Sequence, residues 1–247
     1  MPDLTWFAWA LLAIAAFAVG VSKTAIPGVT TVSVAIFAAI LPAKQSTGAL
    51  LVLLIVADVF AITAYRRHAN WRVLIRLAPA VLVGLALGIL FLAVADDEWV
   101  RKVIGVILLV VIAVTLVRRR IGQTVASGGS HRIAAASYGT LGGFTTMVAN
   151  SGGPVMSMYF LASRFSVKEF LGTAAWFFAI VNIMKVPFSV GLGLITVPGL
   201  LLDLVLVPLV VGGALLGLWF ADRIDQVLFE RLVIIFTVVG AVYLLVI

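Results

Sequence analysis

The sequence GVSKTAIPG, residues 20–28, interrupts long apolar sequence with polar residues, glycines and a proline. A second interruption, ANSGGP at residues 149–154, lies in the other half of the chain. We call these segments the first break and the second break. At the depth of a bilayer core, a helix breaks only against protein or a water-lined cavity, because lipid cannot satisfy its backbone. Two breaks in corresponding halves are typical of the substrate site of a transporter.

The composition indicates an integral membrane protein. Of the 247 residues, 64% are hydrophobic and 11% are charged, whereas soluble domains are about half apolar and about a quarter charged. The apolar runs at residues 103–117 and 200–220 lack the alternation of a membrane β-strand, which favours helices over a barrel. The apolar stretch at residues 4–19 follows Asp3 and no basic segment, so we expect a permanent helix instead of a cleaved signal. The predicted fold is therefore an all-α membrane protein.

Hydrophobicity divides the chain into helical elements, about five in each half. The predicted ranges are 4–20, 28–41, 46–65, 72–94, 100–117, 132–149, 154–163, 170–191, 200–220 and 228–247. The element at residues 154–163 is too short to cross a bilayer, which takes roughly 20 helical residues. We expect a half-helix or a re-entrant segment there, near the midplane.

The two halves share marker residues at nearly constant separations, which indicates an internal duplication. The matched markers are Pro27 with Pro154 (154 − 27 = 127), the Lys44/Gly48 pair with the Lys168/Gly172 pair (168 − 44 = 124), and Pro79 with Pro208 (208 − 79 = 129). An odd number of elements in each half inverts the second half relative to the first. We therefore predict inverted-topology repeats at residues 1–117 and 132–247. A basic Gly/Ser-containing linker at residues 118–131 joins them into one transmembrane domain.

The basic residues explain the net charge of +7 without a nucleic-acid partner. Most of them fall in loops on one predicted side, namely Arg66, Arg67, Arg72, Arg76, Arg118, Arg119, Arg120, Arg132, Arg164, Lys168, Arg223 and Arg231. The other side holds only Lys44, Arg101 and Lys102, beside the acidic residues 96–98. By the positive-inside rule the first side is cytoplasmic, and both termini are periplasmic or extracellular.

Three charges lie deep in apolar sequence: Lys23, Asp58 and Lys185. Each costs about 2.5–3.5 kcal/mol at a helix centre, so such residues are functional candidates. Asp58 matches Asn182 in the duplication (182 − 58 = 124). A desolvated carboxylate takes up a proton more readily than an exposed one, which suggests proton coupling through Asp58 and its counterpart Asn182. A structural salt bridge between Asp58 and Lys23 or Lys185 is the alternative, and the sequence leaves both open.

The breaks have the composition of an anion site. A helix that begins at about Pro27 or Pro154 leaves its first N–H groups unpaired and presents a positive dipole end. The breaks also supply hydrogen-bond donors and glycines that allow close approach: Ser22, Thr24, Gly28, Asn150, Ser151, Gly152 and Gly153. Together with Lys23 and Lys185, two opposed helix N-termini predict a site for a small anion.

Other functional classes lack support in the sequence. The chain has no cysteine, which excludes disulfides and thiolate metal sites. It also lacks a P-loop, a dinucleotide fingerprint and a catalytic His, Cys or carboxylate constellation. We therefore expect no metal, no cofactor and no enzymatic activity.

At this level the sequence resembles the sulfite exporter TauE/SafE family of small bacterial permeases. The resemblance rests on residues 20–28 ahead of the apolar run to Leu41, on the repeat of this pattern at residues 150–154, and on a Pro-x-x-x-x-Gly-x-x-x-Gly helix in each half. It implies a bacterial inner-membrane transporter of sulfite, sulfoacetate or a related sulfur-containing or organic anion. The expected partners are that anion, the lipid bilayer and, in an oligomer, further copies of the chain. A passive anion channel, a membrane-embedded enzyme of sulfur metabolism and a non-transporting subunit are the alternatives.

Overall fold

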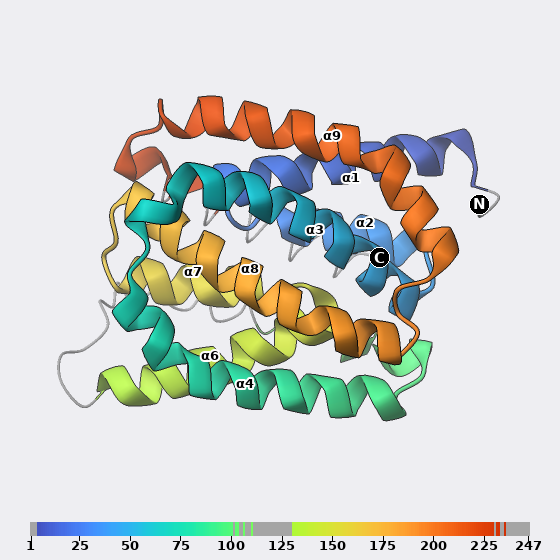
Figure 1. Cartoon of the computed structure of the whole chain (residues 1–247), viewed down its shortest axis with the longest axis horizontal. Helices are drawn as coiled ribbons and strands as arrows, with labels where there is room; N and C mark the ends of the chain where they lie inside the picture. The colour runs from blue at the N-terminus through green and yellow to red at the C-terminus, as the bar shows by residue number, and fades with distance from the viewer. Residues whose placement is uncertain are drawn as a thin grey trace.

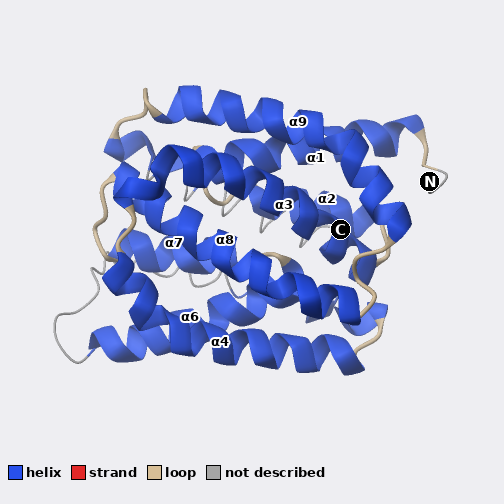
Figure 2. Ribbon diagram, viewed as in Figure 1, coloured by secondary structure: helices blue, strands red, loops and turns tan. Residues whose placement is uncertain are grey.

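The computed structural model describes residues 4–100 and 130–229, with isolated positions between 102 and 110 and between 231 and 235. The described residues form helices and no strand (Figures 1 and 2). The helices are α1 (Trp6–Thr24), α2 (Thr30–Ile40), α3 (Ala43–Tyr65), the 3₁₀ turn η1 (Arg66–His68), α4 (Trp71–Val94), α6 (Ser130–Ala149), α7 (Gly152–Ala162), α8 (Val167–Gly191) and α9 (Val197–Ala221). The predicted all-α fold is confirmed. The linker at 118–131 and the elements at 100–117 and 228–247 fall largely outside the described residues.

Local sequence sets where several helices begin. A side-chain oxygen just before the first turn accepts a hydrogen bond from a free backbone N–H, which stabilises the helix start by about 1 kcal/mol. The capping residues are Thr5 for α1, Asn70 for α4, Ser166 for α8 and Thr196 for α9.

Among the described residues, five helices are long and apolar enough to cross a membrane: α1, α3 with η1, α4, α8 and α9. By contrast, α2 and α7 have 11 residues each, a length of about 16 Å at 1.5 Å per residue. Each packs back against the helix before it, α2 on α1 and α7 on α6. Helix α7 is therefore as short as the sequence predicts for the element at residues 154–163. The predicted starts differ slightly, because α2 begins at Thr30 after a hydrogen-bonded turn and α7 begins two residues before Pro154.

Glycines bring α1 close to α9 and α4 close to α6. A Cβ on Gly20 of α1 would overlap the carbonyl oxygen of Val210, and a Cβ on Gly143 of α6 would overlap that of Val81. These two contacts are related by constant offsets (143 − 20 = 123; 210 − 81 = 129). The same offsets relate a second pair of contacts, Gly213 on Phe17 and Gly84 on Thr140. Closely packed backbones therefore recur at matching positions in the two helix pairs.

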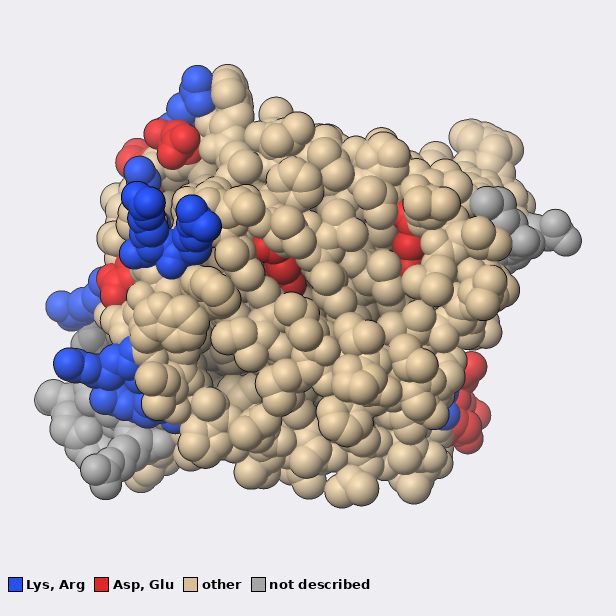
Figure 3. Space-filling view, in the orientation of Figure 1, with Lys and Arg blue, Asp and Glu red and all other residues tan. Residues whose placement is uncertain are grey.

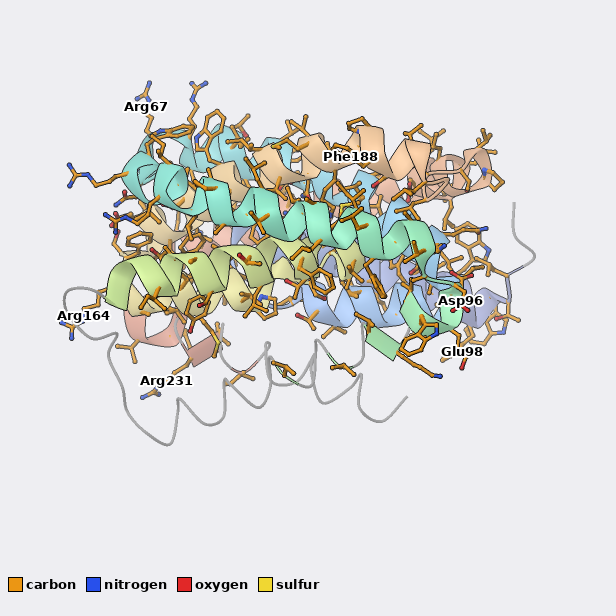
Figure 4. The ribbon with its side chains drawn as sticks, turned by 90° about the horizontal axis from the view of Figure 1, so that it is seen from below. Arg67, Asp96, Glu98, Arg164, Phe188 and Arg231 are labelled. Atoms are coloured by element: carbon orange, nitrogen blue, oxygen red, sulfur yellow. The ribbon has the colours of Figure 1, made fainter. Side chains whose placement is uncertain are left out.

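Most charged side chains gather at the two ends of the helices, and the surface between the ends is mainly uncharged apart from small acidic patches (Figure 3). Arg67, Arg164 and Arg231 lie at one end, and Asp96 and Glu98 lie at the opposite end (Figure 4). We call these the basic end and the acidic end. This distribution agrees with the two sides assigned to these residues from sequence.

Candidate functional site

The two breaks meet at a cavity inside the helix bundle. The short helices α2 and α7 contact each other. The first residues of both helices line the cavity, together with residues of α1, α3, α6 and α8. The space open to the centres of water molecules is about 30 Å³, and one water needs roughly 10–15 Å³ of such space. The cavity thus accommodates about two waters, and a larger anion requires the surrounding side chains to move.

The first break is held by Ser22 at the end of α1. The Ser22 hydroxyl accepts hydrogen bonds from the Thr30 backbone N–H at 3.1 Å and from the Thr30 hydroxyl at 2.6 Å, and it donates to the Ile26 carbonyl at 3.3 Å. Gly28 has a φ of 110°, which glycine adopts without steric cost. These features end α1 and turn the chain into α2 within a few residues.

The second break is held by Asn150 and Lys185. Asn150 has a φ of 52°, a left-handed conformation that asparagine tolerates better than most residues. Its side-chain amide donates to the Thr47 carbonyl at 2.8 Å, and its side-chain oxygen accepts from Lys185 Nζ at 2.5 Å. Lys185 Nζ also donates to the Thr146 carbonyl at 2.6 Å. Lys185 of α8 therefore fixes the end of α6 and the turn into α7.

An ion pair lies next to the cavity. Lys23 Nζ is 2.7 Å from Asp58 Oδ1; the Asp58 side chain is buried, and that of Lys23 is 9% exposed. Asp58 Oδ2 accepts a hydrogen bond of 2.7 Å from the Asn182 amide. Lys23 Nζ also lies 4.4 Å from the centre of the Phe178 ring, a distance at which a cation is attracted to the face of the ring. Asp58 and Asn182, matched in the sequence duplication, are thus directly bonded across α3 and α8.

A family model described as Sulfite exporter TauE/SafE matches residues 12–244 of the chain. The chain belongs to the sulfite exporter TauE/SafE family. The match includes both breaks and all of the spanning helices except the first turns of α1. No curated protein and no solved structure matches the chain significantly.

In this TauE/SafE protein, most of the residues proposed from sequence for substrate or proton lie at the cavity. Its lining includes Ser22, Lys23, Pro27, Gly28, Asn150, Gly153 and Asn182. Asp58 does not line the cavity but is paired with Lys23, which does. Lys185 does not line the cavity either, and it contacts the lining residues Thr146 and Asn150.

Three further predicted residues do not line the cavity. The Thr24 hydroxyl lies 3.0 Å from the carbonyl oxygens of Gly20 and Ala214, so it contacts backbone. A Cβ on Gly152 would press on the Thr146 side chain, which indicates that this glycine serves helix packing. The Ser151 hydroxyl is buried and has no hydrogen-bond partner among the residues that the structure describes.

Sequence reasoning missed several lining residues. They are Thr30, Leu54, Thr146, Ala174, Ala175 and Phe178. Thr30 and Thr146 lie within one or two helical turns of the breaks, and this proximity was the available signal. The residues of α3 and α8 carry no such signal, because only the packing of the helices brings them to the cavity.

Sequence reasoning also missed a fourth ionisable group deep within the spanning helices, beside Lys23, Asp58 and Lys185. Asp203 falls close to the start of the predicted element at residues 200–220 and was not counted among the deep charges. Helix α9 begins earlier, at Val197, since Thr196 caps it and Pro198 suits its first turn. Asp203 therefore lies inside the helix and is only 2% exposed.

The described residues contain no group of three His, Cys, Asp or Glu side chains that could hold a metal ion. The cavity instead offers a lysine, hydroxyls, amides and two helix N-termini. This donor set is suited to an anion that accepts hydrogen bonds.

Proposed function

We propose that this TauE/SafE protein is a secondary transporter of small anions in the bacterial inner membrane. The substrate class is sulfite, sulfoacetate or a related sulfur-containing or organic anion. The observation that carries the proposal is the cavity in which Lys23 and the N-terminal residues of α2 and α7 converge. Helix N-termini attract anions through the positive end of the helix dipole, and the lysine adds a full charge. Membership of the family supports the same function.

Binding of the anion is coupled to protonation of Asp58. In the structure, Lys23 is paired with Asp58 at 2.7 Å. An incoming anion competes with this carboxylate for the same ammonium group. A buried carboxylate that loses its cation is unstable, so Asp58 then takes up a proton while Asn182 holds its second oxygen. One anion and one proton therefore bind in each cycle.

The two halves, residues 1–117 and 132–247, are inverted repeats that move against each other around this site, joined by the linker at 118–131. The repeated glycine contacts of α1 with α9 and of α4 with α6 support this arrangement. So does the direction of the first helix in each half, because α1 and α6 begin at opposite ends of the molecule (Figure 1). We assign the basic end to the cytoplasm, which places both termini in the periplasm.

Thermal unfolding of the detergent-purified protein tests the site directly. Sulfite, thiosulfate, sulfate, sulfoacetate, taurine and simple carboxylates are added to wild type, Lys23→Gln and Lys168→Gln. A ligand at 100 times its Kd stabilises the folded state by about 2.7 kcal/mol. We expect at least one anion to raise the Tm of wild type and of Lys168→Gln, whose lysine is exposed at the start of α8. The shift disappears in Lys23→Gln, because its uncharged side chain no longer attracts the anion.

An equal Tm shift in all three proteins would exclude Lys23 as an anion ligand. Flux into vesicles distinguishes a transporter from a channel. A transporter gives saturable accumulation driven by an ion gradient, whereas a passive channel only equilibrates the anion.

A further inference from the structure

We propose that Asp203 is a second proton-binding site, through which the transporter exchanges protons at its acidic end. The proposal rests on the transport function above and adds a residue that plays no part in the anion site. The carboxyl group carries its proton in the conformation described here and releases it during the transport cycle.

The first observation is the burial of a carboxyl group without a partner. Asp203 is 2% exposed, and neither of its oxygens has a hydrogen-bond partner among the described residues. Asp58 differs, since each of its oxygens faces a donor, Lys23 on one side and Asn182 on the other. A buried carboxylate without a cation or a donor is strongly disfavoured relative to the neutral acid.

No charged group described on the neighbouring helices pairs with the negative charge that an ionised Asp203 would carry. Helix α9 packs mainly on α1 and α3. The titratable side chains that these helices contribute are Lys23, Lys44, Asp58 and Tyr65. Lys23 and Asp58 pair with each other, and the Tyr65 hydroxyl donates to the Thr24 carbonyl at 2.8 Å. Lys44 lies in the first turn of α3, and none of these four groups forms a hydrogen bond or ion pair with Asp203 in the described structure.

The second observation is the depth of Asp203 in the bundle. The segment before α9 lies against the start of α3, because a Cβ on Gly48 would overlap the backbone of Leu194. This is the acidic end, where the Lys44 N–H donates to Asp97 at 3.0 Å. At 1.5 Å per residue, Asp203 lies about 9 Å along α9 and Asp58 about 22 Å along α3. Asp203 therefore lies between the acidic end and the ion pair of the anion site.

A proton is the ligand that this environment fits. A metal ion needs several oxygen ligands, whereas Asp203 is an isolated carboxyl on an otherwise apolar helix. A proton needs only the carboxyl oxygen and removes the charge. The step is a simple acid–base reaction, in which the acid gives its proton to water and becomes a carboxylate when α9 moves and water reaches the group.

Infrared difference spectroscopy tests the protonated state. The carbonyl stretch of a carboxylic acid is separate from that of a carboxylate and shifts in D₂O. We expect a carboxylic acid band at neutral pH in wild type, in Asp58→Asn and in the exposed control Asp222→Asn. The band is lost in Asp203→Asn, which replaces the acid by a neutral side chain of similar shape. A band that persists in Asp203→Asn, or no band in wild type, overturns the proposal.

The role in transport is tested by pH profiles of anion flux in vesicles. We expect the pH-gradient-driven flux of Asp203→Asn to be at least tenfold lower than that of wild type. Its Tm shift with sulfite should equal that of wild type. If flux keeps the wild-type pH profile in Asp203→Asn, the residue has no part in proton exchange. If wild type binds none of the tested anions but shows the band, the proposed function fails and the protonated site remains.

Discussion

Asn150 has two functions at the second break, one for the backbone and one for its side chain. Its φ of 52° ends α6, and its amide joins the Thr47 carbonyl to Lys185 Nζ. Two substitutions separate these functions. Asn150→Gly keeps the backbone freedom and loses the amide, whereas Asn150→Ala loses both.

We expect Asn150→Ala to destabilise the protein more than Asn150→Gly. Alanine in the left-handed region costs about 1–2 kcal/mol, and the loss of a buried hydrogen-bond partner costs about 1–3 kcal/mol in both variants. Chemical denaturation in detergent measures the difference. Equal stability of the two variants would mean that the backbone conformation of Asn150 is not strained.

We propose that Lys185 positions other residues of the site, although the sequence suggested a direct anion ligand. Its ammonium group contacts the Thr146 carbonyl and Asn150, and these residues line the cavity in its place. We expect Lys185→Met to lower the Tm in the absence of ligand, because Asn150 and Thr146 lose their donor. Lys23→Gln removes the Tm shift with anions instead. If Lys185→Met keeps the ligand-free Tm of wild type but loses the Tm shift caused by anions, Lys185 is instead a direct anion ligand.

At the scale of helices, sequence predicted the spanning elements well because bilayer burial makes them continuously apolar. The starts of helices were less accurate where a cap, and not the apolar run, decides them, as Thr196 does for α9. The composition of the breaks identified Ser22, Lys23 and Asn150 at the cavity. The Thr24 hydroxyl contacts the backbone of α9 and does not line the cavity, and Phe178 was missed, since their surroundings depend on which helix packs against them.

The glycines of the close helix pairs allow a test of packing. Gly20→Ala places a methyl group onto the Val210 carbonyl of α9, so the helices must separate. We expect a loss of about 1–3 kcal/mol in the free energy of unfolding. Gly191→Ala is the matched control, because a Cβ there meets nothing within 4 Å. Equal stability of the two variants would show that α1 and α9 are not in close contact.

At the scale of the whole molecule, two corresponding helix pairs pack differently. Under the proposed repeat relation, α3 with α9 corresponds to α8 with α4. Helix α9 packs along α3, whereas α4 contacts α8 little and apolar cavities of about 130 and 90 Å³ lie between them. If the halves exchange these packings during transport, α4 closes on α8 when α9 separates from α3.

This exchange predicts a cross-link that stops transport. Leu85 and Met184 line both cavities between α4 and α8. The chain has no native cysteine, so Leu85→Cys with Met184→Cys gives a single pair of thiols. We expect a short disulfide-containing cross-linker to abolish anion flux, and cleavage of this linker by a reductant to restore the flux. Each single-cysteine variant serves as control. Full flux in the cross-linked protein would mean that α4 and α8 do not move relative to each other.

The ion pair between Lys23 and Asp58 also has a consequence for energetics across the bilayer. Without substrate the pair has no net charge. With a singly charged anion on Lys23 and a proton on Asp58, the sum of the charges is again zero. If, as proposed, one anion and one proton bind in each cycle, the loaded and empty forms cross the membrane electric field equally easily, and transport of such an anion is electroneutral. The concentration ratio of the anion and the pH difference set its direction, while the membrane voltage does no work on it.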